Sequence, residues 1–129
     1  MSVSFTNEQI NTPGFNEALN SLVEKPLPQA TSWVLADLVE GISAQQKKFA
    51  QARADIVQRN GGIKDARGLW GFDAKHPVTE DAEKEFAELM VQTQEIAIEP
   101  IKLPDKDSKG QPIDYAPSVI RHLKPALRR

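Results

Sequence analysis

Apolar side chains recur every three or four positions between Gln29 and Arg59, a pattern that predicts one long helix. With one polar member, the stripe is Leu35, Leu38, Ile42, Gln45, Phe49, Ala52 and Ile56. Such spacing brings one helix face against a partner helix. The helix should end at Asn60, Gly61 and Gly62, since glycine takes the left-handed conformation after a helix without steric cost. At ~1.5 Å per residue the helix would be about 45 Å long and would need a long partner.

A second stripe supplies the expected partner, and it begins after Thr79. Its members step by four and three: Ala82, Phe86, Leu89, Thr93 and Ile96. Thr79 suits the N-cap, and Glu80 and Asp81 follow where the helix dipole favours negative charge. We therefore predict a mainly α fold built on a long antiparallel helical hairpin that resembles a coiled coil.

The charges along the two expected helices are opposite in sign. Residues 47–59 hold four basic side chains against one acid, a balance of +3, whereas residues 80–99 hold seven acids against one lysine, a balance of -6. The two stripes could also join two copies of the protein. The complementary charges favour pairing within one molecule, because the basic end of the first helix would then lie beside the acidic start of the second.

Shorter elements are expected before the hairpin. Residues 1–11 show no sustained period and indicate an N-terminal arm, with an extended or edge-strand segment around Val3 and Phe5. Thr12 and Pro13 form a helix start, because the hydroxyl can accept from an unpaired N–H group and proline suits the first helical position. The short helix ends at Pro26 and Pro28. Trp33, at the start of the long helix, is expected to pack against it.

The connection between the two long helices is rich in large apolar residues. A turn at Asp65–Gly68 would pair Ile63–Lys64 with Leu69–Phe72 as a small β-like tip. Trp70 and Phe72 could be interface anchors, as aromatic residues often are, or could fold back over the hairpin end as a minor core. Both interpretations stay open at this point.

The C-terminal segment differs in composition from the rest. Prolines disfavour a helix after the second stripe, so residues 96–103 should be extended. We expect residues 1–103 to form the hairpin domain and residues 104–129 a proline-containing C-terminal arm, in which Pro117 opens a short basic helix. Without any acidic side chain after residue 117, the basic residues give a local charge of +4: Arg121, Lys124, Arg128 and Arg129.

Composition fits one narrow core. A length of 129 residues with 40% hydrophobic but only 6% aromatic residues suits a few helices packed closely together. A net charge of -2 gives the whole molecule no field that would attract nucleic acid or an anionic membrane. Without cysteine there can be no disulfide, no thiolate zinc site and no thiol nucleophile. No segment approaches the ~20 apolar residues that span a bilayer.

Side chains that could carry catalysis or bind a metal are scarce. His76 and His122 are the only histidines, and neither has an acidic companion on the same expected helix face. Three carboxylates would share one helical face: Asp81, Glu85 and Glu88. Lys84 lies among them and no histidine joins them, which indicates a solvated acidic surface. We therefore predict a protein that is not an enzyme and has no cofactor or metal site.

The order of these parts is informative. A long helix whose second half is rich in alanine, arginine and glutamine ends at Asn60 and Gly61. A strand-like insert, an acidic helix and an isoleucine-rich exit follow, with the residues Glu85, Phe86, Glu88, Leu89, Ile96, Ile98 and Glu99. Over residues 29–103 this resembles a group of small uncharacterised tailed-bacteriophage proteins. The resemblance implies a place in virion structure or assembly and carries over no catalytic residues; residues 104–129 depart from the group.

We expect a structural or assembly protein of a bacteriophage capsid, neck or tail, assembled in the host cytoplasm and held in the virion. Its partners would be other virion proteins and copies of itself, without membrane or nucleic acid, since four basic charges neutralise few phosphates. The residues expected at protein interfaces are Trp70, Phe72, Ile113, Tyr115, Ile120, Arg121, Lys124 and Arg128. Two other roles remain open: an adaptor or inhibitor that docks its tip on a host protein, and a tail or capsid assembly chaperone.

Overall fold

Helices dominate the structure, a computed structural model that describes residues 1–128; Arg129, counted above in the basic C-terminus, lies outside the described residues. Helical residues make up 52% of the chain, which confirms the prediction of a mainly α fold. None of the helices within residues 1–128 is both long and apolar enough to cross a bilayer. In chain order the elements are β1 (Val3–Thr6), α1 (Asn7–Asn11), α2 (Phe15–Val23), α3 (Gln29–Arg59), β2 (Ile63–Lys64), β3 (Trp70–Gly71), α4 (Glu80–Val91), β4 (Thr93–Ile96), α5 (Pro117–Leu123) and the 3-10 helix η1 (Lys124–Ala126).

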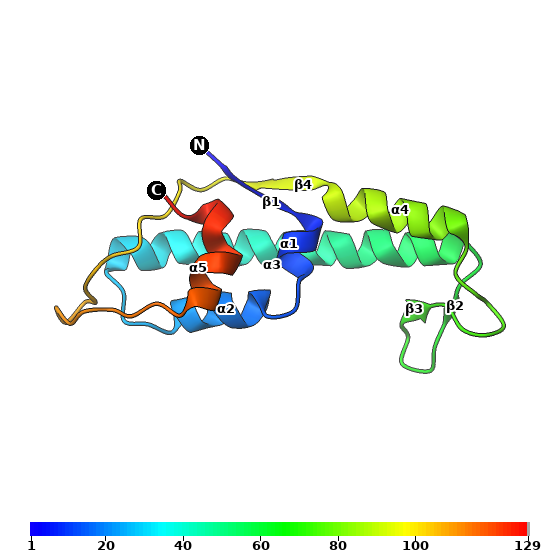
Figure 1. Cartoon of the computed structure of the whole chain (residues 1–129), viewed down its shortest axis with the longest axis horizontal. Coiled ribbons are helices and arrows are strands. Elements are labelled where there is room, and N and C mark those ends of the chain that lie inside the picture. Colours follow the sequence, from blue (N-terminus) through cyan, green and yellow to red (C-terminus); the bar gives the residue numbers. More distant parts are fainter. Residues whose placement is uncertain (129) are drawn as a thin grey trace.

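Helix α3 forms the long axis of the molecule, and the other elements lie along its sides (Figure 1). Its bounds are those predicted from the sequence. The helix follows Pro28 and ends at Arg59; the backbone N–H of the C-cap residue Asn60 donates to the carbonyls of Ile56 and Val57. Gly61 follows with a φ of 80°, in the left-handed conformation that glycine adopts freely.

The main core surrounds the N-terminal half of α3, where Leu35, Leu38 and Ile42 face inward. Its other buried residues come from the rest of the chain: Val3, Phe5, Ile10, Phe15, Ala18, Leu19, Leu22, Leu27, Ile96, Ile98, Ile101, Val119, Leu123 and Ala126. Both ends of the chain therefore contribute to this core. A smaller second core lies between the C-terminal half of α3 and α4 and is centred on Ile56, Ala82 and Leu89.

Helix α4 ends at Val91, and the prediction that its helical stripe continues through Thr93 and Ile96 is wrong. Both residues lie in β4, which pairs antiparallel with β1 so that Ile96 is opposite Val3. Threonine and isoleucine suit a strand, and pairing with β1 satisfies their backbone groups. Consequently α4 lies only along the C-terminal half of α3, while β4 lies alongside its N-terminal half (Figure 1).

Gly41 allows β4 to approach α3 closely. A Cβ atom at this position would lie 2.6 Å from Cγ2 of Ile96, closer than such atoms can come without a shift. Glycine lowers helix stability by about 1 kcal/mol relative to alanine. The cost to α3 is therefore offset by the packing of a buried isoleucine against its backbone.

Two helices, not one, precede α3. The first, α1, was not predicted; Thr6 caps it by accepting from the N–H of Gln9 at 3.1 Å, while the Gln9 side chain accepts from the N–H of Thr6 at 2.8 Å. Thr12 and Pro13 lie between α1 and α2, so the predicted helix start at these residues is wrong. The second helix instead begins after Gly14, which has a φ of 91°.

Trp33 does not pack against α2, and that prediction is wrong too: 67% of the residue is exposed. It lies two positions before the buried Leu35. At about 100° of rotation per residue, this places the indole on the opposite side of α3 from the main core.

The C-terminal segment belongs to the main core and is not the extended arm that we expected. The predicted helix after Pro117 is present as α5, and it packs against α2. Three residues of the segment are fully buried: Val119, Leu123 and Ala126. The N–H of Ile101 donates to the carbonyl of Ala126, and the N–H of Arg128 donates back to Ile101, both at 2.7 Å. The edge strand expected around Val3 and Phe5 is present as β1, and its pairing with β4 fixes the N-terminal arm to the molecule.

Candidate functional site

The residues expected at protein interfaces lie in three places. Trp70 and Phe72 lie at the tip, the β2–β3 hairpin. Four others line a groove beside α5: Ile120, Arg121, Lys124 and Arg128. Ile113 and Tyr115 are half-buried against the main core, and the Tyr115 hydroxyl donates to the carbonyl of Pro104 at 2.5 Å. These last two residues hold the C-terminal segment onto the molecule.

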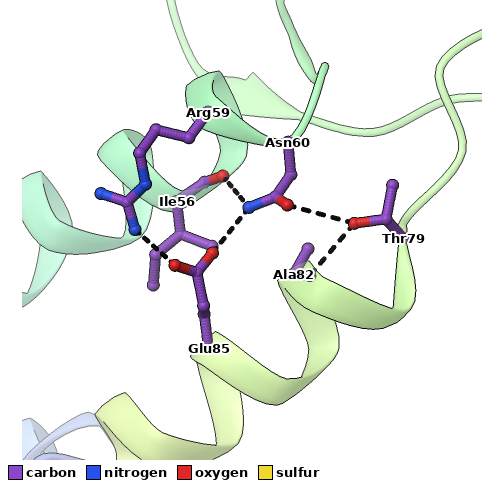
Figure 2. Close-up of polar contacts among 6 residues, drawn as sticks. All are labelled: Ile56, Arg59, Asn60, Thr79, Ala82 and Glu85. Carbon is purple, nitrogen blue, oxygen red and sulfur yellow. Dashed lines mark hydrogen bonds and ion pairs between the residues drawn. The ribbon is translucent and has the colours of Figure 1, made fainter.

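A polar network joins the end of α3 to the start of α4 and has Asn60 at its centre (Figure 2). The Asn60 amide donates to the carbonyl of Ile56 at 2.8 Å and to the carboxylate of Glu85 at 2.7 Å. Its oxygen accepts from the hydroxyl of Thr79, the N-cap of α4, at 3.3 Å. Arg59 donates to the other Glu85 oxygen at 2.7 Å. The hydrogen bonds from Asn60 and Arg59 hold the pKa of Glu85 below its ordinary range.

Arg53 connects the tip to both long helices. Its guanidinium donates to the carbonyl of Trp70 at 3.0 Å and lies 5.9 Å from the ring centroid of Phe86 on α4. Of the complementary charges noted along α3 and α4, Arg59 and Glu85 form the one ion pair between these helices within residues 1–128. Arg53 thus positions the tip through a carbonyl and an aromatic ring instead of a carboxylate.

Phe72 packs into the second core. Its ring meets Phe86 edge to face, with the centroids 6.4 Å apart, and it lies with the partly buried residues around Ile56, Ala82 and Leu89. Phe72 was expected either as an interface anchor or as part of a minor core, and its position is that of a minor-core residue. Its contact ties the tip to α4.

The tip itself is built on the turn predicted at residues 65–68. The Asp65 carboxylate accepts from the N–H groups of Arg67 at 2.8 Å and Leu69 at 2.9 Å, and β2 pairs with β3 across it. Between the tip and α3 lies a hollow of about 510 Å³, which Trp70 and Phe72 help to line. Leu69 is 60% exposed at its margin. The tip therefore presents apolar surface far along α3 from the main core (Figure 1).

The second candidate is a groove of about 1000 Å³ at the C-terminal segment, which we call the basic groove. Its lining residues are Gln9, Lys102, Leu103, Ile120, Arg121, Lys124, Pro125, Leu127 and Arg128. Four of them are basic and none is acidic. Three branched apolar side chains lie among the cations, and of these Ile120 is 42% exposed. Such a lining suits an anionic partner that also offers apolar side chains.

Neither histidine lies in a cluster of side chains that could bind a metal ion. The N–H of His76 donates to the Asp73 carboxylate at 2.7 Å, and this bond is the largest cause that lowers the pKa of Asp73. The ring of His122 stands at the edge of Phe15, with the centroids 6.4 Å apart. Within the described residues 1–128, no three or more histidines and carboxylates lie close enough together to hold a metal ion.

Sequence reasoning missed two groups of residues. Lys102, Leu103 and Leu127 complete the basic groove, but they lie on both sides of the boundary drawn between residues 103 and 104. Asn7, a buried polar residue, was not singled out, because only the fold brings it to the end of α4. The positive charge of the last helix was the signal that could have located the groove.

The amino-acid sequence matches no model of a protein family. The curated proteins and the solved structures likewise give no match to the chain.

Proposed function

We propose that this chain is a structural or assembly protein of a bacteriophage particle, in its capsid, neck or tail, which works through protein–protein contacts and catalyses no reaction. In this proposal α3 and α4 form a helical hairpin that serves as a rigid support for the tip. The phage setting rests on the sequence resemblance over residues 29–103. The contact function rests on the tip.

The observation that carries the proposal is the apolar tip, which is held in place by several contacts yet remains open to solvent. Arg53 and Phe72 fix it to α3 and α4, so little conformational entropy would be lost when a partner binds. Leu69 is largely exposed, and Trp70 lines the adjoining hollow. A tryptophan at a rigid, solvent-facing hollow is typical of the anchors of a protein interface.

The proposal predicts that the tip is needed for incorporation into particles. Trp70→Ala should reduce the amount of the chain in purified phage particles at least tenfold, since loss of an interface anchor costs about 2 kcal/mol or more. Quantitative mass spectrometry of the particles measures this. Trp33→Ala is the matched control, because Trp33 is exposed but lies at the other end of α3, and it should leave incorporation unchanged.

Melting curves of both variants should match that of the unsubstituted chain, which separates loss of contact from loss of fold. Absence of the unsubstituted chain from finished particles would contradict a structural role. An assembly chaperone would then be favoured if the chain binds particle precursors. An adaptor or inhibitor would be favoured if it binds a host protein through Trp70.

A further inference from the structure

We propose that the basic groove binds the solvent-facing side of helix α4 of a second copy of the same chain. The inference deepens the proposed function, because it names the partner of one contact surface, and it concerns different residues from those of the tip. Helix α4 would lie with its acidic side chains against the basic residues of the groove and its last apolar residue against the groove's apolar side chains.

The groove has the composition of a site for an acidic helix. Its cations come from three parts of the chain, the extended segment at Lys102, helix α5 with Arg121, and the chain end with Lys124 and Arg128. Cations on several sides of one groove make a local positive potential that the net charge of -2 conceals. The branched side chains among them, Leu103, Ile120 and Leu127, supply apolar area that a free anion would not use.

The solvent-facing side of α4 offers the matching pattern. Five exposed residues share this side, away from the buried Ala82 and Leu89: Glu80, Glu83, Lys84, Ala87 and Val91. Two of them are acidic and one is basic, and Val91 is 67% exposed. The helix as a whole carries five carboxylates against Lys84. An acidic first half and an apolar last turn complement cations set around branched apolar side chains.

The contact must form between copies. The end of α4 contacts α1, which supplies Gln9 to the groove, but the acidic first turns of α4 lie at the far end of α3 from α5 (Figure 1). One molecule therefore cannot place these acidic side chains against its own basic groove. Two different surfaces that bind each other make a head-to-tail contact, which produces a ring if the rotation closes and a filament if it does not. Both are forms that particle components adopt.

Sedimentation of the full chain at about 0.05 M and about 0.5 M salt tests the proposal. The unsubstituted chain should associate at the lower salt and dissociate at the higher salt, because exposed charges are screened. A groove variant, Arg121→Glu with Lys124→Glu, should weaken association at least tenfold. A helix variant, Glu80→Lys with Glu83→Lys, should do the same. The matched control, Lys47→Glu with Lys48→Glu on exposed positions of α3, should associate normally.

The decisive arm mixes the groove variant with the helix variant. In the mixture, a groove that has become acidic can bind a helix that has become basic, so the mixture should associate more tightly than either variant alone. Loss of fold could not produce this recovery. A chain that stays monomeric at about 1 mM and low salt would overturn the proposal, as would failure of the mixture to recover. Neither result would affect the Trp70 test, so the proposed function would stand or fall separately.

Discussion

Leu123→Ala should lower the free energy of unfolding by about 2–5 kcal/mol, the usual cost of a cavity left by a buried leucine. Leu123 is fully buried in the main core, on the face of α5 that packs against α2. A free C-terminal arm would lose almost nothing from the same substitution. The value comes from urea unfolding of the whole chain, followed by circular dichroism, which is dominated by the long helix α3.

Ile120→Ala is the matched control, because Ile120 lies one turn earlier on α5 but is 42% exposed. Truncating this side chain should lower the free energy of unfolding by less than about 1 kcal/mol, since little buried apolar area is lost. Equal and small effects at both positions would mean that α5 does not belong to the main core. Large effects at both would mean that the groove side of α5 is covered in the free chain.

Asn7→Asp should destabilise the protein by about 3 kcal/mol or more at neutral pH, the second largest effect that we expect. Asn7 is 2% exposed, and its amide donates to the carbonyl of Leu89 at 2.8 Å, near the end of α4. Its backbone N–H donates to Gln92 at 3.0 Å. A carboxylate here could not donate and would place a buried charge against the carbonyl oxygen. Asn7→Ala should cost less, about 0.5–1.5 kcal/mol, because it removes one hydrogen bond to the Leu89 carbonyl, which still accepts from the N–H of Gln92 at 3.3 Å.

The effect of Asn7→Asp should depend on pH with a definite sign. Burial raises the pKa of the introduced carboxyl above its value in the unfolded chain, so the protonated form, which can donate to Leu89, is favoured in the folded state. The stabilisation that this protonated carboxyl contributes is fully present below the pKa that the group has in the unfolded chain. It is lost as the pH rises through the higher pKa that the group has in the folded chain. Urea unfolding at about pH 4 and pH 7 checks this. A deficit that is the same at both pH values, as we expect for Asn7→Ala, would contradict the position of Asn7.

The sequence predicted elements whose ends carry their own local signals. The bounds of α3 follow from the proline before it and from Asn60 and Gly61 after it, and α4 begins at the N-cap Thr79 as expected. The turn at residues 65–68 also formed as predicted. In each case the stabilising contacts lie within a few residues, so neighbouring positions contain the information.

The end of α4 could not be predicted in the same way. Thr93 and Ile96 continue the helical spacing, yet Gln94, Ile96 and Ile98 also alternate as a strand does, and both periods fit the same residues. Pairing with β1, about ninety positions earlier in the chain, decides between them. Such a contact is visible only once the fold is known.

The two candidate surfaces also differ in whether neighbouring residues in the sequence reveal them. Trp70 was found because aromatic residues in a short loop stand out locally. The basic groove joins Gln9, Lys102 and Leu127, and a parallel bridge between Leu127 and Ile101 brings two of its segments side by side. From sequence, prolines at positions 104, 112 and 117 make this region resemble a linker. Burial of three apolar side chains after them outweighs that local preference.

Amide hydrogen exchange of the intact chain, resolved by mass spectrometry, tests most directly whether the two ends of the chain and the first half of α3 form one core. Amides of residues 119–123 should exchange as slowly as those of residues 35–42, because both open only when the main core unfolds. Amides of residues 66–69 at the tip should exchange much faster. Rapid exchange throughout residues 104–128 beside a protected α3 would contradict the single core and restore a free C-terminal arm.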